Sequence, residues 1–354
     1  RRRRPGRRLR QGPARALRGR GLRRAHGGAR GACARPALVH GGNLTGGAGD
    51  DTFNAPAVEQ QGAAGSADSL EGFDILDGGA GIDTLNATIN AGAAVAPSLS
   101  NIENVIMRVT KAGGAIDFAA STGVQSVTVQ NSTAATGTIA NLGAVATLAV
   151  KNQNQNVTFD GSTAATLGLT LDTFGKNVGG VITANTVDLG AATAAKATTL
   201  NVTANNAYAK IDSTKADTIS TVTIAATGTN QISFADSGAT IKSATITGTG
   251  SVDLTPTAFT GDLATFNASA AEGVIKADIQ SKVLATVTTG KGADWIDMDT
   301  AVVAGTTVNL GAGNDTLLTG ALLGNFAKVD GGDGDADTIN IVDGAKLDAA
   351  NAKL

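Results

Sequence analysis

The residues best suited to chemistry in this chain are aspartates that follow closely spaced glycines. Two segments fit the nine-residue pattern G-G-x-G-x-D-x-U-x, where U is a large apolar residue: 46–54 (GGAGDDTFN) and 78–86 (GGAGIDTLN). Glycines accept positive φ and allow a tight turn that points backbone carbonyls inward, and the aspartate adds a carboxylate. Hard oxygen ligands of this kind suit Ca²⁺, so the pattern predicts calcium-binding turns.

Four further segments carry the pattern in modified form. In GKGADWI and GAGNDTLL the first glycine of the pattern is replaced, by Thr289 and Leu310 respectively. GGDGDADTI (331–339) has one extra residue before its last aspartate, and GFDIL (72–76) contains only half of the motif. The candidate metal ligands of all six turns are Gly47, Gly49, Asp51, Asp74, Gly79, Gly81, Asp83, Gly290, Gly292, Asp294, Gly311, Gly313, Asp315, Gly332, Asp333, Gly334 and Asp337.

One such turn supplies only part of a calcium shell, which needs six to eight oxygens, so a stacked neighbour must complete it. Asp294, Asp315 and Asp337 follow one another at steps of 21 and 22 residues, which predicts that they lie on one edge of successive coils. The related turn at 248–254 has Val252 in the aspartate position and is interpreted as metal-free. We therefore expect metal toward both ends of the stack and none in its middle.

Other interpretations of these turns are weaker. A single Gly-Asp turn is most simply an ordinary β-turn, and only the number and registry of the copies favours calcium. Magnesium suits carbonyl-rich turns poorly because it demands a small octahedral shell. Residues 41–354 contain no His or Cys, so a zinc or iron site has no support there.

The elements that must position these turns recur with a period of about 22 residues. Apolar-x-apolar triplets begin at Val105, Val127, Leu148, Leu167, Leu200, Val222, Ala244, Phe266, Val287, Val308 and Val329. The step of 33 from Leu167 to Leu200 is interpreted as one period plus an insertion within 173–190. In most periods a second short β-branched strand follows a polar turn, which predicts an all-β parallel β-solenoid (β-helix or β-roll) with coils of 21–22 residues.

An antiparallel sandwich is the alternative fold, but sandwiches seldom keep a fixed spacing between strands. Residues 98–104 and 346–354 are interpreted as short helices or frayed ends. Tyr208 and Trp295 are interpreted as ordinary solenoid positions in preference to a platform on which a sugar would stack.

Composition supports a repeat protein and argues against an enzyme. Of 354 residues, 47 are glycine and only 3% are aromatic, which leaves few large side chains for a conventional core. Residues 1–40 hold 14 of the 28 basic residues and no acid, so the rest carries a net charge of about −16. Without His or Cys, residues 41–354 cannot form an HExxH site, a Ser-His or Cys-His pair, or a CxxC motif.

The chain is divided into five segments on these patterns. Residues 1–40 are an Arg-rich leader that is expected to be disordered and need not belong to the native protein. Residues 41–97 form an N-terminal calcium-binding segment, and 98–288 contain the strand repeats. Residues 289–345 form calcium-binding coils, and 346–354 are the end of a fragment. A nucleic-acid or membrane-binding arm is the alternative for the leader. It lacks the apolar core of a secretory signal, and no stretch of the chain is apolar enough to span a bilayer.

The motifs GGAGDDTFN, GGAGIDTLN, GKGADWI, GAGNDTLL and GGDGDADTI resemble the RTX (repeats-in-toxin) calcium repeat, which forms a right-handed parallel β-roll in that family. With a long Thr/Ala/Val-rich region between them, residues 41–344 are similar to the surface-layer proteins of Gram-negative bacteria. The resemblance implies an extracellular, cell-surface lattice subunit that is exported by a type I apparatus and folds when calcium arrives. The chain departs from the family in lacking an obvious C-terminal secretion segment and a recognisable lipopolysaccharide-anchoring domain.

These observations lead to one main hypothesis and two alternatives. The main hypothesis is a structural, non-enzymatic subunit that self-associates into a lattice, with cell-surface polysaccharide held through a part outside this chain, and with no nucleic-acid partner or membrane insertion. The alternatives are a secreted adhesin or biofilm-matrix stalk, and the RTX tail of a toxin or enzyme whose catalytic domain lies elsewhere. The insertion at 173–190 has one aromatic residue, Phe174, which argues against a ligand-binding tip.

Overall fold

The computed structural model describes residues 42–59, 66–194, 196–214, 218–235, 240–298, 305–319, 328–341 and 352–353. These residues form an all-β parallel β-solenoid of about 11 turns, as the repeat period predicted. The only helix among them is the four-residue α1 (Ala191–Ala194), and no helix there is long and apolar enough to cross a membrane. The leader at 1–40 and most of 346–354 lie outside the described residues.

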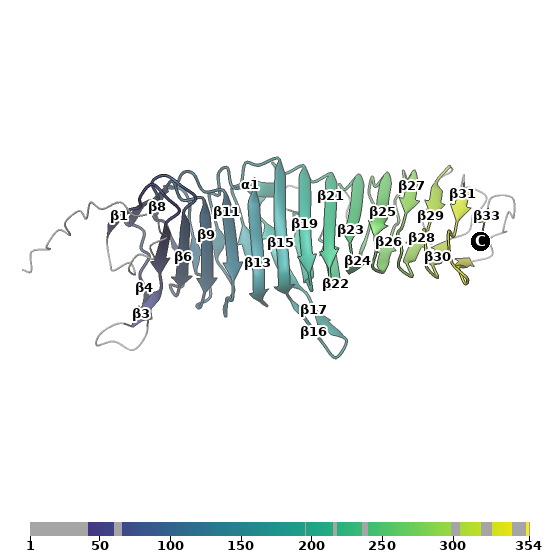
Figure 1. The fold of residues 1–354 in the computed structure, drawn as a ribbon, viewed down its shortest axis with the longest axis horizontal. Coiled ribbons are helices and arrows are strands. Elements are labelled where there is room, and N and C mark those ends of the chain that lie inside the picture. Colours follow the sequence, from purple (N-terminus) through teal and green to yellow (C-terminus); the bar gives the residue numbers. More distant parts are fainter. Residues whose placement is uncertain are drawn as a thin grey trace, which may run out of the picture. The chain divides into compact units, whose positions relative to one another are not determined.

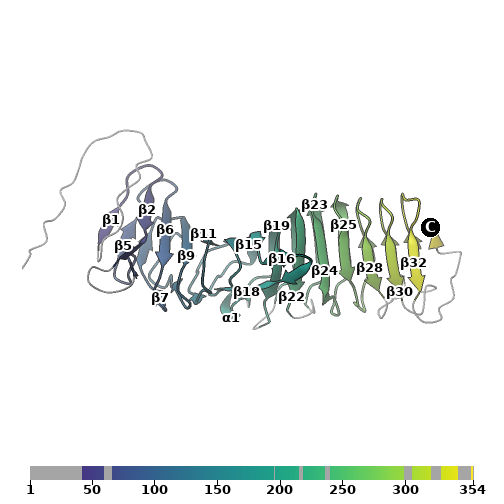
Figure 2. The same cartoon turned by 90° about the horizontal axis from the view of Figure 1, so that it is seen from below.

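One long sheet runs the length of the stack, and a second begins at residue 138 and continues toward the C-terminal end (Figures 1 and 2). The first sheet has 14 parallel strands: β2 (Thr52–Ala55), β6 (Thr84–Ile89), β9 (Asn104–Val109), β11 (Ser126–Gln130), β13 (Thr147–Gln153), β15 (Thr166–Phe174), β19 (Thr199–Asn205), β21 (Thr221–Thr227), β23 (Ser243–Gly248), β25 (Thr265–Ala271), β27 (Thr286–Thr288), β29 (Thr307–Asn309), β31 (Lys328–Asp330) and β33 (Ala352–Lys353). The second sheet has ten: β12 (Thr138–Ile139), β14 (Val157–Phe159), β18 (Asn185–Leu189), β20 (Tyr208–Asp212), β22 (Thr229–Phe234), β24 (Ser251–Ala258), β26 (Ile275–Asp278), β28 (Trp295–Met298), β30 (Thr316–Thr319) and β32 (Thr338–Ile341).

Smaller sheets complete the N-terminal coils. A third sheet contains β1 (Asn43–Thr45), β5 (Ile75–Asp77) and β8 (Ser98–Ser100), and β7 (Ala94–Val95) pairs with β10 (Ala115–Ile116). The interpretation of 98–104 as a short helix or frayed end is wrong at β8. Its Leu99 points into the core between outward serines, and its three residues pair in register with β5.

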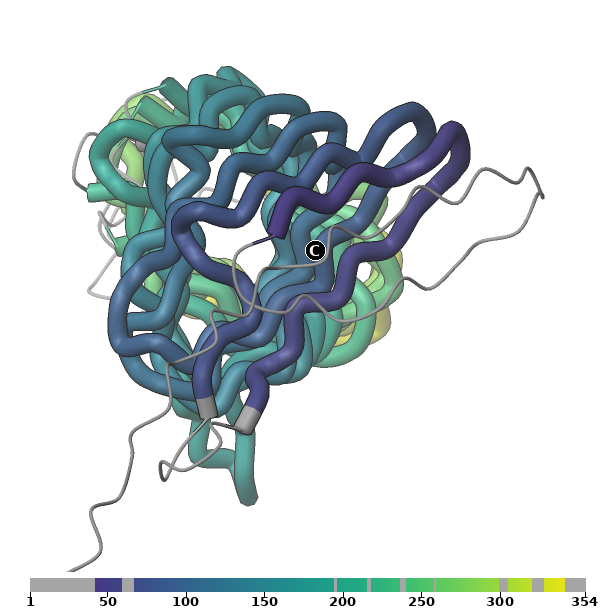
Figure 3. The backbone as a smooth tube through the Cα atoms, turned by 90° about the vertical axis from the view of Figure 1, so that its left-hand side faces the viewer, coloured from purple at the N-terminus to yellow at the C-terminus, as the bar shows by residue number. Residues whose placement is uncertain are grey.

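The register of the first sheet confirms most of the predicted ladder. Val105 pairs with Val127, and Phe266, Val287, Val308 and Val329 pair in succession. Each step joins equivalent positions on adjacent coils. Viewed from the N-terminal end, the coils lie one behind another (Figure 3).

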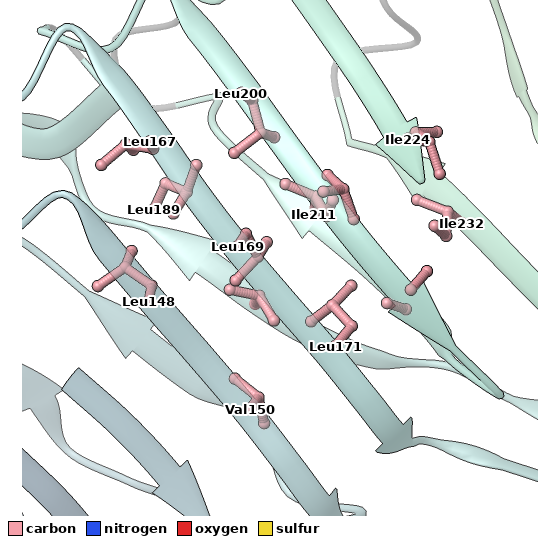
Figure 4. Packing of buried hydrophobic residues seen from close by; sticks show 14 of the residues in the cluster. Leu148, Val150, Leu167, Leu169, Leu171, Leu189, Leu200, Ile211, Ile224 and Ile232 are labelled. Atoms are coloured by element: carbon pink, nitrogen blue, oxygen red, sulfur yellow. The ribbon is translucent and has the colours of Figure 1, made fainter. Parts of the chain in front are cut away.

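One step of the predicted ladder is wrong. Leu148 pairs with Leu169 and not with Leu167, whereas the predicted step from Leu167 to Leu200 is present. Strand β15 is nine residues long, and its Leu167, Leu169 and Leu171 all point into the core (Figure 4). A slip of two residues keeps the same side chains inside, so the apolar pattern alone cannot fix this register.

The interior is filled by rows of aliphatic side chains contributed by both sheets (Figure 4). Leu169 of β15, Leu189 of β18 and Val202 of β19 are each 1% exposed or less. Small and branched side chains suit a narrow interior, because each must fill the gap between two coils without pushing them apart. This explains the scarcity of large residues in the composition.

Two hairpins project from the stack. The insertion expected within 173–190 contains the antiparallel pair β16 (Lys176–Val178) and β17 (Val181–Thr183), which extends away from the coils in Figure 1. Gly179 and Gly180 both have positive φ, 61° and 86°, as a tight two-residue hairpin turn requires. The second hairpin joins β3 (Ala57–Glu59) to β4 (Ser66–Asp68) near the N-terminal end.

Candidate functional site

The aspartates of the last three motifs form a ladder that we call the C-terminal array: Asp294, Asp315 and Asp337. Each stands directly before a strand of the second sheet, and those strands, β28, β30 and β32, are neighbours (Figure 2). The Asp315 Oδ1 atom accepts a hydrogen bond from the Asp294 backbone N–H at 2.7 Å. Asp337 Oδ1 does the same for Asp315 N–H at 3.0 Å. The predicted registry of these residues is therefore present.

A second ladder, the N-terminal array, contains Asp51, Asp83 and Glu103. Asp83 Oδ1 accepts from the Asp51 N–H at 2.6 Å, and Glu103 Oε2 accepts from the Asp83 N–H at 2.7 Å. Glu103 was not among the predicted ligands because no glycine pair precedes it. The signal that could have found it is its place directly before a strand, 20 residues after Asp83, close to one coil period.

The two arrays lie on different edges of the solenoid. The N-terminal acids stand before β2, β6 and β9, at the start of first-sheet strands. The C-terminal acids stand in turns that leave the first sheet and enter the second, as from β27 to β28. The motif pattern is the same in both places, because it specifies a tight turn followed by a strand and does not specify which sheet that strand joins.

Asp74 of the half motif is fully buried but belongs to neither array. It stands before β5 of the third sheet, on another edge. Its Oδ1 accepts from the Gly42 N–H of the preceding coil at 3.0 Å, and its Oδ2 accepts from the Glu71 N–H at 2.7 Å. Both oxygens therefore take backbone donors.

The motif glycines are needed because successive turns press against each other. Gly313 has φ of 129°, and a Cβ there would lie 2.2 Å from the Gly292 carbonyl oxygen. The same close approach to a glycine carbonyl of the preceding coil recurs along both arrays: Gly79 on Gly47, Gly81 on Gly49, Gly311 on Gly290, Gly332 on Gly311 and Gly334 on Gly313. Any side chain at these positions would separate the coils.

Gly311→Ala tests this requirement against a matched control. We expect the free energy of unfolding to fall by about 2 to 4 kcal/mol, because the new Cβ would lie 2.2 Å from the Gly290 carbonyl oxygen while φ is 86°. Gly305→Ala shares a positive φ of 93° but has open space around it, so it should cost only about 1 kcal/mol. Urea denaturation measures both values. Equal losses would show that turn stacking is not the constraint.

The middle acid of each array has a buried oxygen without a partner. Asp83 and Asp315 are 0% exposed, and the Oδ2 atom of each makes no hydrogen bond. In Asp294, by contrast, Oδ2 accepts from the Gly290 N–H at 3.2 Å. In the Asp315 turn the equivalent donor, Gly311 N–H, is directed to Asn309 Oδ1 at 3.1 Å. A buried, unpartnered carboxylate oxygen is costly and calls for a cationic or proton-donating complement.

Electrostatics point the same way. Burial, with smaller contributions from the carboxylates of Asp294 and Asp337, raises the pKa of Asp315 to about 6. Burial also raises the pKa of Asp83, with Asp51 and Glu103 adding to the effect. The pKa of Asp294 is raised mainly by burial. Each array therefore holds acids that are unfavourable when charged without a counter-ion.

A cation bound at either array would need many of its ligands from the backbone. Among the described residues, no group of three or more His, Cys, Asp or Glu side chains surrounds a common point. Carbonyl oxygens of the stacked glycine turns would have to supply much of the shell, which suits calcium better than a metal that prefers side-chain ligands. Asp333 is exposed, and its backbone N–H donates to the Gly311 carbonyl at 2.7 Å, which docks its turn on the preceding one.

Comparison with protein-family models, with curated proteins and with solved structures found no match for this chain.

Proposed function

We propose that this chain is a structural, non-enzymatic subunit of a bacterial surface layer, stiffened by Ca²⁺ held between its stacked Gly-Asp turns. The proposal of calcium binding rests on the buried Oδ2 atom of Asp315. This atom accepts no hydrogen bond, and Asp315 lies between the two other acids of its array. Asp83 repeats this arrangement in the N-terminal array. Because both arrays contain a buried carboxylate oxygen without a hydrogen-bond donor, the same kind of cation would suit both.

In the C-terminal array the ligands would be the three aspartates and carbonyls of the glycines stacked beside them. When bound, calcium supplies positive charge that neutralises the buried carboxylates. Residues 41–354 carry a net charge of about −16, so the uncompensated stack repels itself. Binding free energy then becomes folding free energy, and the chain folds where calcium is abundant.

The surface-layer assignment, the extracellular location and export by a type I apparatus are supported by the resemblance of the motifs and their layout to RTX-type surface-layer proteins. The solenoid suits such a role because each coil needs only its neighbours, and the stack can present the same surface repeatedly. In this proposal the Gly-Asp turns bind calcium and hold adjacent coils together. No pair of a nucleophile and a base occurs in the two arrays.

Electron microscopy of the full chain tests the assembly. We expect ordered sheets in millimolar calcium and dispersed particles after addition of EGTA. The Asp315→Asn variant should need more calcium to form sheets than the wild type does. Monodisperse rods at high protein concentration in calcium would instead favour the adhesin-stalk alternative.

A further inference from the structure

The single tyrosine and the single tryptophan of the sequence lie in one outward-facing row of the second sheet. Cross-strand pairing places Tyr208, Gln231, Asp253, Lys276 and Trp295 in succession. Tyr208 is half-buried between the inward-pointing Ala207 and Ala209, and Trp295 is half-buried between Asp294 and Ile296. We call these five residues the outer row.

The β16–β17 hairpin turns part of this row into a groove. A hollow of about 310 Å³ is lined by Asn177 and Ile182 of the hairpin together with Tyr208, Gln231, Asp253 and Lys276 of the row. Asn177 Nδ2 lies 3.5 Å from the Tyr208 hydroxyl, within reach of donating to it. The hairpin thus forms a wall beside the tyrosine ring.

Polar groups between the two rings are held in place. Gln231 Nε2 donates to Asp253 Oδ2 at 2.9 Å, and the Thr255 N–H and hydroxyl donate to Asp253 Oδ1 at 2.9 and 2.6 Å. A carboxylate retains further acceptor capacity after these bonds. Within the described part of the chain, Lys276 makes no ion pair and its ammonium is free to donate. The row therefore offers an oriented acceptor and a donor between two aromatic platforms.

Charge decides which class of ligand complements this surface. Asp278 and Asp297 pair across β26 and β28 and face outward beside the row. With Asp253 they balance the outward-facing Lys210 and Lys276 and the exposed Lys176 of the hairpin, so the surface has no excess of positive charge. A surface without net positive charge does not attract nucleic acids or anionic polysaccharides. Uncharged sugars carry hydroxyls that both donate and accept, and their apolar ring faces stack on aromatic side chains.

We propose that the outer row binds an uncharged polysaccharide chain lying along the solenoid axis, with sugar rings stacked on Tyr208 and Trp295 and hydroxyls bonded to Asp253 and Lys276. Strands β20 and β28 are four steps apart in the second sheet, through β22, β24 and β26. At the usual strand spacing the two rings are about 19 Å apart, a span that several linked sugars cover and a disaccharide does not. This inference does not depend on calcium binding.

Trp295 is the only tryptophan, so its fluorescence reports directly on the site. The full chain at constant calcium is titrated with neutral hexasaccharides of glucose, N-acetylglucosamine, mannose and galactose, and with the matching disaccharides. We expect at least one hexasaccharide to change the emission and to bind about tenfold more tightly than its disaccharide, because it reaches both rings. Tyr208→Ala should remove that length advantage and leave disaccharide binding at Trp295 unchanged.

Control variants show whether sugar binding belongs to the outer row. Thr223→Ala, on the outward side of the first sheet, should leave binding unchanged. Asp315→Asn should alter the calcium response but not sugar binding, whereas Tyr208→Ala should do the reverse, so either proposal can fail alone. The proposal is overturned if none of the four hexasaccharides binds by fluorescence or calorimetry, if Tyr208→Ala binds like wild type, or if hyaluronan, an anionic chain, binds as tightly as the best neutral one.

Discussion

Calcium at about 10 mM should raise the free energy of unfolding of the C-terminal coils by about 3 to 5 kcal/mol. Extracellular calcium modules bind with Kd of about 10⁻⁴ to 10⁻³ M, and an ion at tenfold to hundredfold excess over Kd contributes about 1.4 to 2.7 kcal/mol. The C-terminal array has two positions between adjacent coils, Asp294 to Asp315 and Asp315 to Asp337. Asp315 belongs to both of them.

Asp315→Asn should therefore abolish most of the calcium response. The amide keeps the size of the side chain and removes its charge. Asp172→Asn is the matched control, since Asp172 lies in the middle of the stack and accepts from Asn205 Nδ2 at 2.9 Å, away from both arrays. It should retain the full response to calcium.

Hydrogen exchange locates the effect. Added calcium should slow amide exchange in residues 290–298 and 305–319 far more than in the central strands β13 to β21. A uniform gain in protection along the whole stack would contradict the expected metal-free middle. Loss of the calcium response in Asp172→Asn as well as in Asp315→Asn would show that the arrays are not its source.

The fold was largely predictable because a solenoid forces its sequence to repeat. Each coil must return every inward residue above its predecessor, so the steps from Phe266 to Val329 match the pairing found in the structure. The slip at Leu148 was not predictable, because β15 offers three equivalent apolar positions. Ser98–Ser100 was misread because a three-residue strand is too short to show a period.

The sequence indicated most residues of the two arrays, but it indicated less well how these residues are arranged. Spacings of 21 and 22 residues bring Asp294, Asp315 and Asp337 together, since each matches the length of one coil. The β3–β4 hairpin lengthens the first coil, so the separation of 32 residues between Asp51 and Asp83 does not fit the period that revealed the other pairs. Glu103 was missed because its turn lacks the glycines that mark the others.

The outer row shows a further limit of sequence reasoning. Tyr208 and Trp295 stand in different contexts, and nothing in either segment marks them as partners. The steps between them through Gln231, Asp253 and Lys276 are unequal, and only the strand pairing shows that they end in one row. A period derived from the core positions describes the inward side chains and carries no information on which outward ones matter.

In the absence of calcium, the stability of the chain should fall as pH rises from about 4 to about 7. The carboxyl of Asp315 has a folded-state pKa of about 6 against an ordinary value of 3.8. Between these values the folded chain keeps a proton that the unfolded chain has lost, so the unfolded state binds fewer protons and the free energy of unfolding decreases with pH. The stabilisation is complete below about pH 4 and is lost as pH passes through 6, a change of about 3 kcal/mol. The raised pKa values of Asp83 and Asp294 act in the same direction.

Urea denaturation in EGTA at intervals from pH 4 to pH 8 measures this slope. The other carboxylates of an acidic chain also titrate, so the informative quantity is the difference between wild type and Asp315→Asn, whose slope should be shallower because the amide does not ionise. A pH slope as steep in Asp315→Asn as in the wild type would contradict the burial of an unpartnered charge at Asp315. Saturating calcium should oppose the fall in the wild type, because the ion binds only the deprotonated carboxylate, and should leave Asp315→Asn nearly unchanged. Protons and calcium would then compete for the same buried oxygen, and that competition separates a metal-binding role for Asp315 from a purely structural one.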